Sequence, residues 1–339
     1  MSSQPPIRIA TISNNPDPDW AWLRDVAGAD FTIANRPLEW RAFSVAGKAG
    51  VENAATRFFG TRRLAFAAAK KPFDLIVSHG PWTTAWTEWF GRKGAAKHLA
   101  YSFNFTDLPT GPRKAIMRPA FNKVDAFAVF TDAEQKLYEH FFNLHESKLL
   151  RAPWGVAPPI ASPGEKTIDS DYYAALGGEA RDYAVLCEAA RRCPGLQFVA
   201  VARPQNFDGL EVPDNLTVLF NLPFEEAWSI IWHAKAALLP LRSRETPCGL
   251  VSLVGAMHLG KAQIVTAAAG VSEYIEDEKT GLLIPPNEAE ALTTAVQRLE
   301  NDPALAARLG DTARTYAAAH CSEAATVAFF RGLMERWFA

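Results

Sequence analysis

The chain has 339 residues, 48% hydrophobic residues and a formal net charge of −2. This length exceeds the roughly 250–300 residues at which single cores usually split, so two domains are expected. The composition is that of a water-soluble globular protein, and no apolar run approaches the ~20 residues of a membrane-spanning helix.

The N-terminal residues run directly into an apolar strand, which predicts no signal peptide and a cytoplasmic location. The four cysteines lack metal-ligand spacing and are expected to be free thiols in a reducing compartment. Charge is uneven: residues 1–155 carry 20 Lys and Arg against 14 Asp and Glu, whereas residues 156–339 carry 15 against 23. This asymmetry predicts that the first half meets something anionic, with an ordinary solvated surface as the alternative.

Short apolar runs alternate with helical stretches along both halves, which is typical of parallel α/β sheets. In the first half the predicted strands are Ile7–Ile12, Phe31–Asn35, Phe73–Ser78, His98–Phe103, Ala126–Thr131 and Leu149–Pro153. In the second half they are Asp171–Leu176, Gln197–Val201, Leu216–Phe220, Ala236–Leu241, Gln263–Thr266 and Gly281–Ile284. Each half is therefore predicted to be a doubly wound, Rossmann-like unit.

Proline and glycine mark the expected boundaries. Residues 157–166 (APPIASPGEK) predict a linker. Three helices are expected to close the chain, over Asn287–Glu300, Pro303–Ala318 and Ser322–Phe338. The predicted organisation is a first domain over residues 1–156, a second over 157–320, and a last helix over 321–339 that packs back on the first.

Ligands in such sheets bind outside the carboxyl ends of the strands, so residues just past each strand are the site candidates. In the first half this selects His79, which could position a hydroxyl or shuttle a proton, or could instead be a buried imidazole that holds its loop. In the second half it selects Asn221 for contacts to a base. Arg203 and Arg242 are selected there as positive charges.

The loop Arg242–Cys248 leads to a glycine that opens an apolar helix. Amides at a helix start lack intrahelical partners and carry partial positive charge, so Cys248, Gly249 and Leu250 are expected to hold an anion such as a diphosphate. Gly249 lets the ligand approach the backbone. Cys248 is interpreted there as a small packing residue rather than a nucleophile.

The run CGLVSLVGAMHLGKAQIVTAAAGVSEYIEDEKTGLLIPP, with GGEARDYAVLCEA and APWGVAPP upstream, resembles the donor-binding stretch of family 4 glycosyltransferases. The resemblance covers roughly residues 148–320 well and the first half loosely. It implies the GT-B fold, with two Rossmann-like domains that face each other across a cleft. The implied activity is retaining transfer of a sugar from a nucleoside diphosphate sugar, UDP- or GDP-linked, to a glycan or a lipid-linked acceptor.

The resemblance also implies roles for individual residues. Glu245 stands near the place of a glutamate that contacts the donor sugar, and Glu273 matches a position near the donor. Arg181 aligns with a phosphate-binding lysine, with a capping or ion-pair role as the alternative. Asn104 stands where the family often has a histidine that touches the donor sugar.

Two positions depart from the family pattern. Gly255 replaces a second glutamate that holds the ribose, and Gly178 replaces an arginine. These departures, with Asn104, support the alternative of a non-catalytic GT-B protein that binds a sugar nucleotide or a partner. An epimerase or phosphorylase on the same fold is a third reading.

No dinucleotide-binding glycine fingerprint, phosphate-binding Walker loop or zinc spacing is present, so neither a cofactor nor a metal is expected. Residues Arg41–Lys71 carry seven Lys or Arg and one Glu among several phenylalanines, and Pro81–Lys97 adds tryptophans and further cations. Such segments can lie on an anionic bilayer, which predicts peripheral contact with the inner membrane face. The alternative is that these aromatic residues face the core of ordinary crossover helices. Nucleic acid is not expected as a partner.

Overall fold

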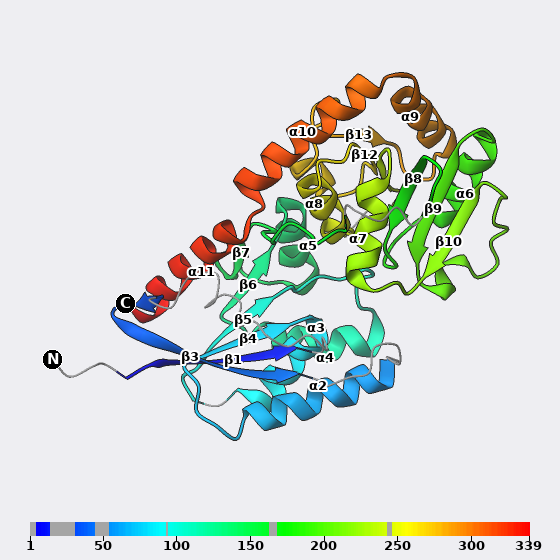
Figure 1. Cartoon of the computed structure of the whole chain (residues 1–339). Coiled ribbons are helices and arrows are strands. Elements are labelled where there is room, and N and C mark those ends of the chain that lie inside the picture. Colours follow the sequence, from blue (N-terminus) through cyan, green and yellow to red (C-terminus); the bar gives the residue numbers. More distant parts are fainter. Residues whose placement is uncertain (1–4, 14–30, 45–53, 93, 163–167, 243–245) are drawn as a thin grey trace. The chain divides into compact units, whose positions relative to one another are not determined.

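The structure is a computed structural model that describes residues 5–13, 31–44, 54–92, 94–162, 168–242 and 246–339. Of residues 54–58 it describes the backbone only. The chain forms two compact units: unit 1 comprises residues 1–153 and 323–339, and unit 2 comprises residues 154–322 (Figure 1).

Unit 1 is built on a seven-stranded sheet of order β2-β3-β1-β4-β5-β6-β7. Neighbouring strands are parallel except β2 and β3, which are antiparallel. The strands are β1 (Ile7–Ser13), β2 (Thr32–Ile33), β3 (Arg36–Ser44), β4 (Leu75–His79), β5 (Lys97–Tyr101), β6 (Ala126–Val129) and β7 (Leu149–Arg151). The helices are α2 (Ala54–Ala68), α3 (Pro81–Trp86), η1 (Thr87–Gly91), α4 (Gly111–Phe121), α5 (Asp132–Phe142), η2 (Glu146–Lys148) and α11 (Glu323–Phe338).

Unit 2 is built on a six-stranded parallel sheet of order β10-β9-β8-β11-β12-β13. The strands are β8 (Tyr172–Leu176), β9 (Gln197–Ala202), β10 (Leu216–Phe220), β11 (Ala237–Leu239), β12 (Gln263–Thr266) and β13 (Leu282–Ile284). The helices are α6 (Tyr183–Arg192), η3 (Pro204–Phe207), α7 (Phe224–His233), α8 (Leu250–His258), η4 (Val271–Glu273), α9 (Ala289–Asn301) and α10 (Pro303–His320).

The central strands are apolar on both faces because helices cover both sides of each sheet. Strand β8, with sequence YYAAL, is buried over its first four residues. Its two faces enter different core clusters: Tyr173 and Ala175 in one, Tyr172 and Ala174 in the other. In unit 1 the core is rich in aromatic rings, with Phe103 at edge-to-face geometry to Phe121 and Phe127.

Both sheets reverse their winding direction beside their first strand. In unit 1 the chain passes from β1 to β3 on one side, and β4 then pairs on the other side of β1. In unit 2 it passes from β8 through β9 and β10, and β11 then pairs on the opposite side of β8. Such a switch point leaves a crevice at the carboxyl ends of the two strands, so it marks the place in each unit where a ligand is expected.

Strand β3 is the main difference from the predicted elements. Its sequence RPLEWRAFS alternates apolar and charged residues and contains a proline, and it pairs along its length with β1. The basic stretch from Arg41 onward therefore begins within a strand. The three closing helices were predicted to within two residues of their ends.

Candidate functional site

The loop after β8 brings a buried arginine to the switch point of unit 2. Gly177 has a φ of 126° and donates its amide to Val201 O (3.0 Å), and the Tyr183 hydroxyl donates to Gly177 O (2.5 Å). Arg181 then pairs with Leu241 as an isolated bridge, and the Arg242 amide donates to Ala180 O (3.0 Å). Backbone hydrogen bonds therefore join the loops that follow β8 and β11.

The Arg181 side chain is 8% exposed and makes three hydrogen bonds to neutral acceptors. Nε donates to Leu176 O (3.1 Å), one terminal nitrogen to Glu179 O (2.8 Å) and the other to Ser252 Oγ (2.8 Å). Burial lowers the pKa of the guanidinium, and nearby Tyr183, Cys248 and Glu179 oppose that shift. A guanidinium keeps its charge in proteins, so a positive charge is held at this point without an ion pair to any carboxylate that the structure describes.

Helix α8 begins beside this guanidinium. Gly249 caps the helix with a φ of 88°, and a Cβ built on Gly249 would lie 3.2 Å from a terminal nitrogen of Arg181. Cys248 is 6% exposed, and its sulfur lies 3.5 Å from Thr246 Oγ1, as expected for a packing residue. Leu250 is also buried, so only its backbone can serve a ligand. The helix start and Arg181 thus place positive charge together at the switch point of unit 2.

Arg203 lies over the glycine loop. Its guanidinium pairs with the Glu179 carboxylate, its amide donates to Asn206 Oδ1 (3.0 Å), and the Asn206 amide donates to Gly178 O (2.8 Å). A Cβ built on Gly178 would lie 2.9 Å from Arg203 Nε, so glycine is the residue that fits beneath this side chain. Arg181 and Arg203 therefore reach the same loop from two strands, although Arg203 is half exposed and already paired.

Gly255 is placed in the core rather than at an open surface. It lies within α8, and a Cβ built on it would be 2.1 Å from the indole of Trp228 on α7. The indole is 1% exposed, and its Nε1 has no hydrogen-bond partner in the part of the chain that the structure describes. A glutamate at this position would require Trp228 to move. The glycine at position 255 is therefore the residue that leaves room for the tryptophan.

The remaining candidates of unit 2 lie on the same edge of its sheet, at different distances from its centre. Asn221 is exposed after the edge strand β10, with a φ of 53° and its amide bonded to Ala202 O (3.1 Å). Glu273 ends η4 after β12, and its carbonyl accepts from the Tyr316 hydroxyl (3.2 Å). Arg242 is exposed after β11. Glu245 lies outside the described residues.

In unit 1 the switch-point candidate is His79, the last residue of β4. It is 7% exposed and faces the ring of Tyr101, its register partner on β5, at 5.9 Å. Burial lowers the pKa of the imidazole to about 3, so the ring is neutral at neutral pH. Gly80, with a φ of 85°, then turns the chain into α3.

Asn104 follows the adjacent strand β5. It is exposed, whereas Phe103 and Phe105 on either side are buried in the aromatic core. Two anchored rings therefore hold an amide at the surface in a fixed place. The amide can donate and accept hydrogen bonds to a hydroxyl but cannot transfer a proton.

A buried series of hydrogen-bonded side chains begins at Ser78, one residue before His79. Ser78 Oγ is 2.7 Å from His98 Nε2, and His98 Nδ1 is 2.6 Å from Glu88 Oε1. Glu88 also pairs with Arg92 (3.3 Å). These distances resemble a nucleophile with its base, but Ser78 and His98 are 0% exposed, so no substrate reaches the hydroxyl. This series ties β4, β5 and η1 together beneath the loop that carries His79.

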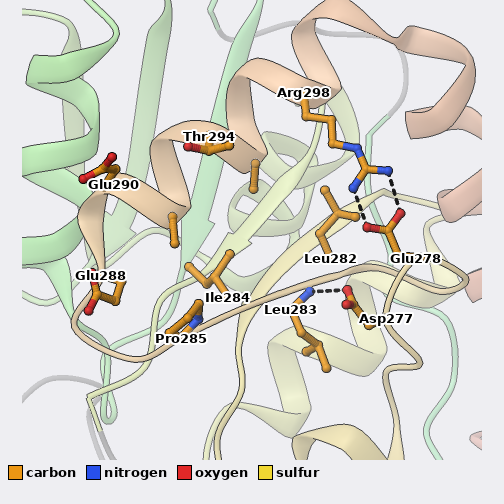
Figure 2. Close-up of a pocket in the computed structure, with 12 residues that line it drawn as sticks. Asp277, Glu278, Leu282, Leu283, Ile284, Pro285, Glu288, Glu290, Thr294 and Arg298 are labelled. Carbon is orange, nitrogen blue, oxygen red and sulfur yellow. Dashed lines mark hydrogen bonds and ion pairs between the residues drawn. The ribbon is translucent and has the colours of Figure 1, made fainter.

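A pocket of ≈ 440 Å³ lies elsewhere in unit 2, between β13 and α9 (Figure 2). Arg298 in its wall forms a two-fold pair with the Glu278 carboxylate, and Asp277 accepts from the Leu283 amide (2.8 Å). The pairing with Arg298 lowers the pKa of Glu278. With Glu288 and Glu290 also in its lining, this pocket repels an anion and is not the site of a diphosphate.

Sequence reasoning missed three residues of the unit 2 site: Ser252, Tyr183 and Trp228. Ser252 accepts from Arg181 and donates to Leu176 O (3.0 Å), which links the start of α8 to β8. Its place three residues after Gly249 could have indicated this role. The contacts of Tyr183 and Trp228 depend on chain segments far apart in sequence and left no local signal.

The fold defined by these two units is that of the GT-B glycosyltransferases. It is similar to sucrose-phosphate synthase from Thermosynechococcus elongatus, with a TM-score of 0.75 at 20% identity over 98% of this chain and 99% of that chain. It is also similar to HepE of Anabaena crystallised with UDP-glucose, with a TM-score of 0.69 at 14% identity over 97% and 99% of the two chains.

Sequence comparison agrees with the fold. Residues 205–316 match the family "Glycosyl transferases group 1". This match covers about a third of the chain and lies in unit 2, where the sequence resemblance is strongest; the narrower assignment to family 4 stays a prediction.

Two curated relatives match parts of the chain. A glycogen synthase of Thermodesulfovibrio yellowstonii is 39% identical over 75 residues, which cover 22% of this chain and 15% of that protein. An alpha-D-kanosaminyltransferase of Streptomyces kanamyceticus is 30% identical over 142 residues, which cover 40% of this chain and 36% of that protein. The chain thus matches well under two thirds of the length of either relative.

Proposed function

We propose that the chain transfers a sugar from a nucleoside diphosphate sugar to a glycan or lipid-linked acceptor, with retention of anomeric configuration. Unit 2 would hold the donor and unit 1 the acceptor. The observation that carries this proposal is Arg181, a buried guanidinium with only neutral hydrogen-bond partners at the switch point of a Rossmann-like sheet.

A buried charge is costly unless an opposite charge compensates it. Arg181 has five N–H groups and uses three of them on Leu176, Glu179 and Ser252. A diphosphate at the start of α8 would supply the compensating negative charge and accept hydrogen bonds from backbone amides of the first helical turn. Its charge grows as the glycosidic bond to the sugar breaks, so the same contacts stabilise the transition state more than the ground state.

The roles on the acceptor side follow from the neutral side chains of unit 1. His79 with a pKa of about 3 and the exposed amide of Asn104 are suited to orient hydroxyl groups. Glu245 is the residue we assign to the donor sugar, on the sequence resemblance alone. With no protein nucleophile assigned, the departing phosphate would take the proton from the acceptor hydroxyl as the new bond forms.

The donor base is proposed to be uracil or guanine. HepE, with the same fold, was crystallised with UDP and with UDP-glucose, which favours trying UDP-linked sugars first. We assign Asn221, which follows β10, to contacts with the base.

The test is a thermal-shift panel of nucleoside diphosphates, followed by incubation with the matching sugar nucleotides and analysis of the products by mass spectrometry. Stabilisation by one diphosphate, and a slow release of sugar from its sugar nucleotide that an acceptor accelerates, would support transfer. A change of the sugar within an intact nucleotide would instead identify an epimerase. Formation of a sugar 1-phosphate from a glycan incubated with inorganic phosphate would identify a phosphorylase.

A second function is favoured by one observation. Trp228 fills the space beside Gly255, where the resemblance places a ribose-binding glutamate. A chain that has lost this contact could bind a sugar nucleotide or a partner without turnover. Diphosphate-dependent stabilisation with no loss of the sugar nucleotide over long incubation would select this function.

A further inference from the structure

One layer of helices in unit 1 presents positive charge without exposed carboxylates. Helices α2 and α4 contain no Asp or Glu, and the acid of η1, Glu88, is buried against His98. Helices α2 and α4 each contact η1, and both lie beside α3 (Figure 1). Five cations of the layer form no ion pair among the described residues: Arg62, Arg63, Lys114, Arg118 and Lys123. A sixth, Arg113, interacts with the exposed Asp107 carboxylate, which opposes the lowering of the Arg113 pKa by burial.

The same layer exposes three large aromatic side chains. Phe59 is 63% exposed, Phe66 43% and Trp89 40%. On α2, Phe59 and Phe66 are seven residues apart, so they lie on one face of the helix, with Arg62 and Arg63 between them.

Cation–aromatic contacts connect the three elements. The Arg62 guanidinium lies 5.5 Å from the ring of Phe66 on α2 and 5.1 Å from the ring of Phe90 on η1. The Lys123 ammonium, just after α4, lies 4.3 Å from the ring of Trp89, whose Nε1 donates to Ile116 O on α4 (3.2 Å). These contacts connect α2 with η1 and η1 with α4. We call the exposed cations and rings of these elements, Phe59, Arg62, Arg63, Phe66, Trp89 and Lys123, the basic aromatic face.

Burial and pairing divide the basic stretch into two kinds of residue. Trp86 is 6% exposed and belongs to the core, and Arg92 and Lys97 are paired with Asp125. We therefore restrict the hypothesis of membrane contact to the residues of the basic aromatic face.

We propose that the basic aromatic face docks on an anionic lipid bilayer. Lipid phosphates would neutralise the unpaired cations, and the exposed rings would enter the interfacial region between headgroups and acyl chains. A soluble anion would meet the cations but leave the phenyl rings in water. The charge of the face, its lack of exposed acids and its rings together therefore favour a bilayer over a free polyanion.

The test is co-sedimentation of the full chain with vesicles of phosphatidylcholine alone and of phosphatidylcholine with phosphatidylglycerol. We expect binding to the anionic vesicles only, weakened by salt. The variant Arg62→Gln/Arg63→Gln/Lys123→Gln should bind about a hundredfold more weakly, at about fivefold for each cation lost. The variant Phe59→Ser/Phe66→Ser, which keeps every charge, should bind about tenfold more weakly.

Matched controls lie on unit 2. Lys279→Gln/Arg314→Gln removes two exposed cations, and Ile160→Ser/Val212→Ser removes two exposed apolar side chains. Both variants should bind as the unchanged chain does. Melting temperatures of all variants, which alter exposed residues only, should stay within a few degrees of one another.

Three results would overturn the proposal: equal binding to neutral vesicles, full binding by the Phe59→Ser/Phe66→Ser variant, or retention on a heparin column without binding to vesicles. The last would identify a polyanion site. The assay contains neither nucleotide nor acceptor, so its outcome is independent of the proposed sugar transfer.

Discussion

The two units are both doubly wound but differ in the charge that they place after their central strands. In unit 2 the loops after β8 and β11 hold the buried guanidinium of Arg181 beside a helix start. In unit 1 a neutral imidazole, His79, ends β4, and an exposed amide, Asn104, follows the neighbouring strand β5. The sheet determines where a ligand is expected, whereas the residues after each strand determine the charge that it would meet. The proposed anionic donor on unit 2 and hydroxyl-bearing acceptor on unit 1 rest on this difference.

The largest expected effect comes from removing the charge in unit 2. Arg181→Ala should lower kcat/KM by a hundredfold or more, because the transition state loses a fixed positive charge. It should also abolish the stabilisation that a nucleoside diphosphate gives in a thermal shift. The melting temperature without ligand should change far less, since removing a buried charge that lacks an ionic partner also removes its desolvation cost.

Arg181→Lys is the matched control for charge. It keeps the positive charge but cannot make the same three hydrogen bonds, so it should retain part of the thermal shift by diphosphate. Equal losses of stability and turnover in Arg181→Ala would mean that Arg181 is a structural residue, and the contrast between the units would then fail.

The packing of Gly255 against Trp228 gives the next effect. Gly255→Ala places a methyl group 2.1 Å from the indole, so unfolding free energy should fall by about 1–3 kcal/mol in chemical denaturation. Gly332→Ala is the matched control, because α11 has open space at that position and the change should stabilise by about 0.5–1 kcal/mol. Trp228→Phe in the Gly255→Ala background should recover part of the loss. Equal stabilisation by both alanines would show that the indole does not occupy this space.

Much of this arrangement could be predicted from the sequence. Apolar runs bounded by polar loops identified twelve of the strands. The strand-end rule selected His79, and the family resemblance pointed to Arg181 and Asn104. Strand β3 was not predicted because its charged residues and its proline interrupt the apolar run by which the other strands were recognised.

Tertiary contacts explain the rest. Arg181 bonds Ser252 across 71 residues, and Trp228 meets Gly255 from another helix. Neither partnership has a local pattern, since both depend on how α7 and α8 pack. The same holds for the basic stretch. The sequence shows the number of cations but not that Arg92 is paired with Asp125, whereas Arg62 has no ion pair among the residues that the structure describes.

In unit 1, the neutrality of His79 should be visible in the pH dependence of stability. The imidazole has a pKa of about 3 when folded and an ordinary value of 6.5 when unfolded, so the unfolded state takes up the proton first. The contribution of the neutral His79 imidazole to the free energy of unfolding is complete above pH 6.5 and is lost as the pH falls toward 3. Between pH 6.5 and 5 the loss should be about 2 kcal/mol.

His79→Gln should remove this part of the slope when unfolding free energies are compared at the two pH values. His140→Gln, which changes an exposed histidine on α5, is the control. A slope that is the same in His79→Gln and in the unchanged chain would show that the imidazole is protonated in the folded state. Unit 1 would then carry a charge at its switch point after all.

The smallest expected effect is at Asn104. Because the amide is exposed and its two neighbours are anchored in the core, Asn104→Ala should change unfolding free energy by less than about 0.5 kcal/mol. One lost hydrogen bond to a hydroxyl corresponds to about a tenfold lower kcat/KM for transfer. Asn122→Ala, at an exposed amide after α4 in the same unit, should leave transfer unchanged. If Asn104→Ala also left the rate of transfer unchanged, the contact to the acceptor hydroxyl would have to come from His79 or from outside this loop. The neutral side chains after β4 and β5 would then give no support to acceptor binding by Asn104.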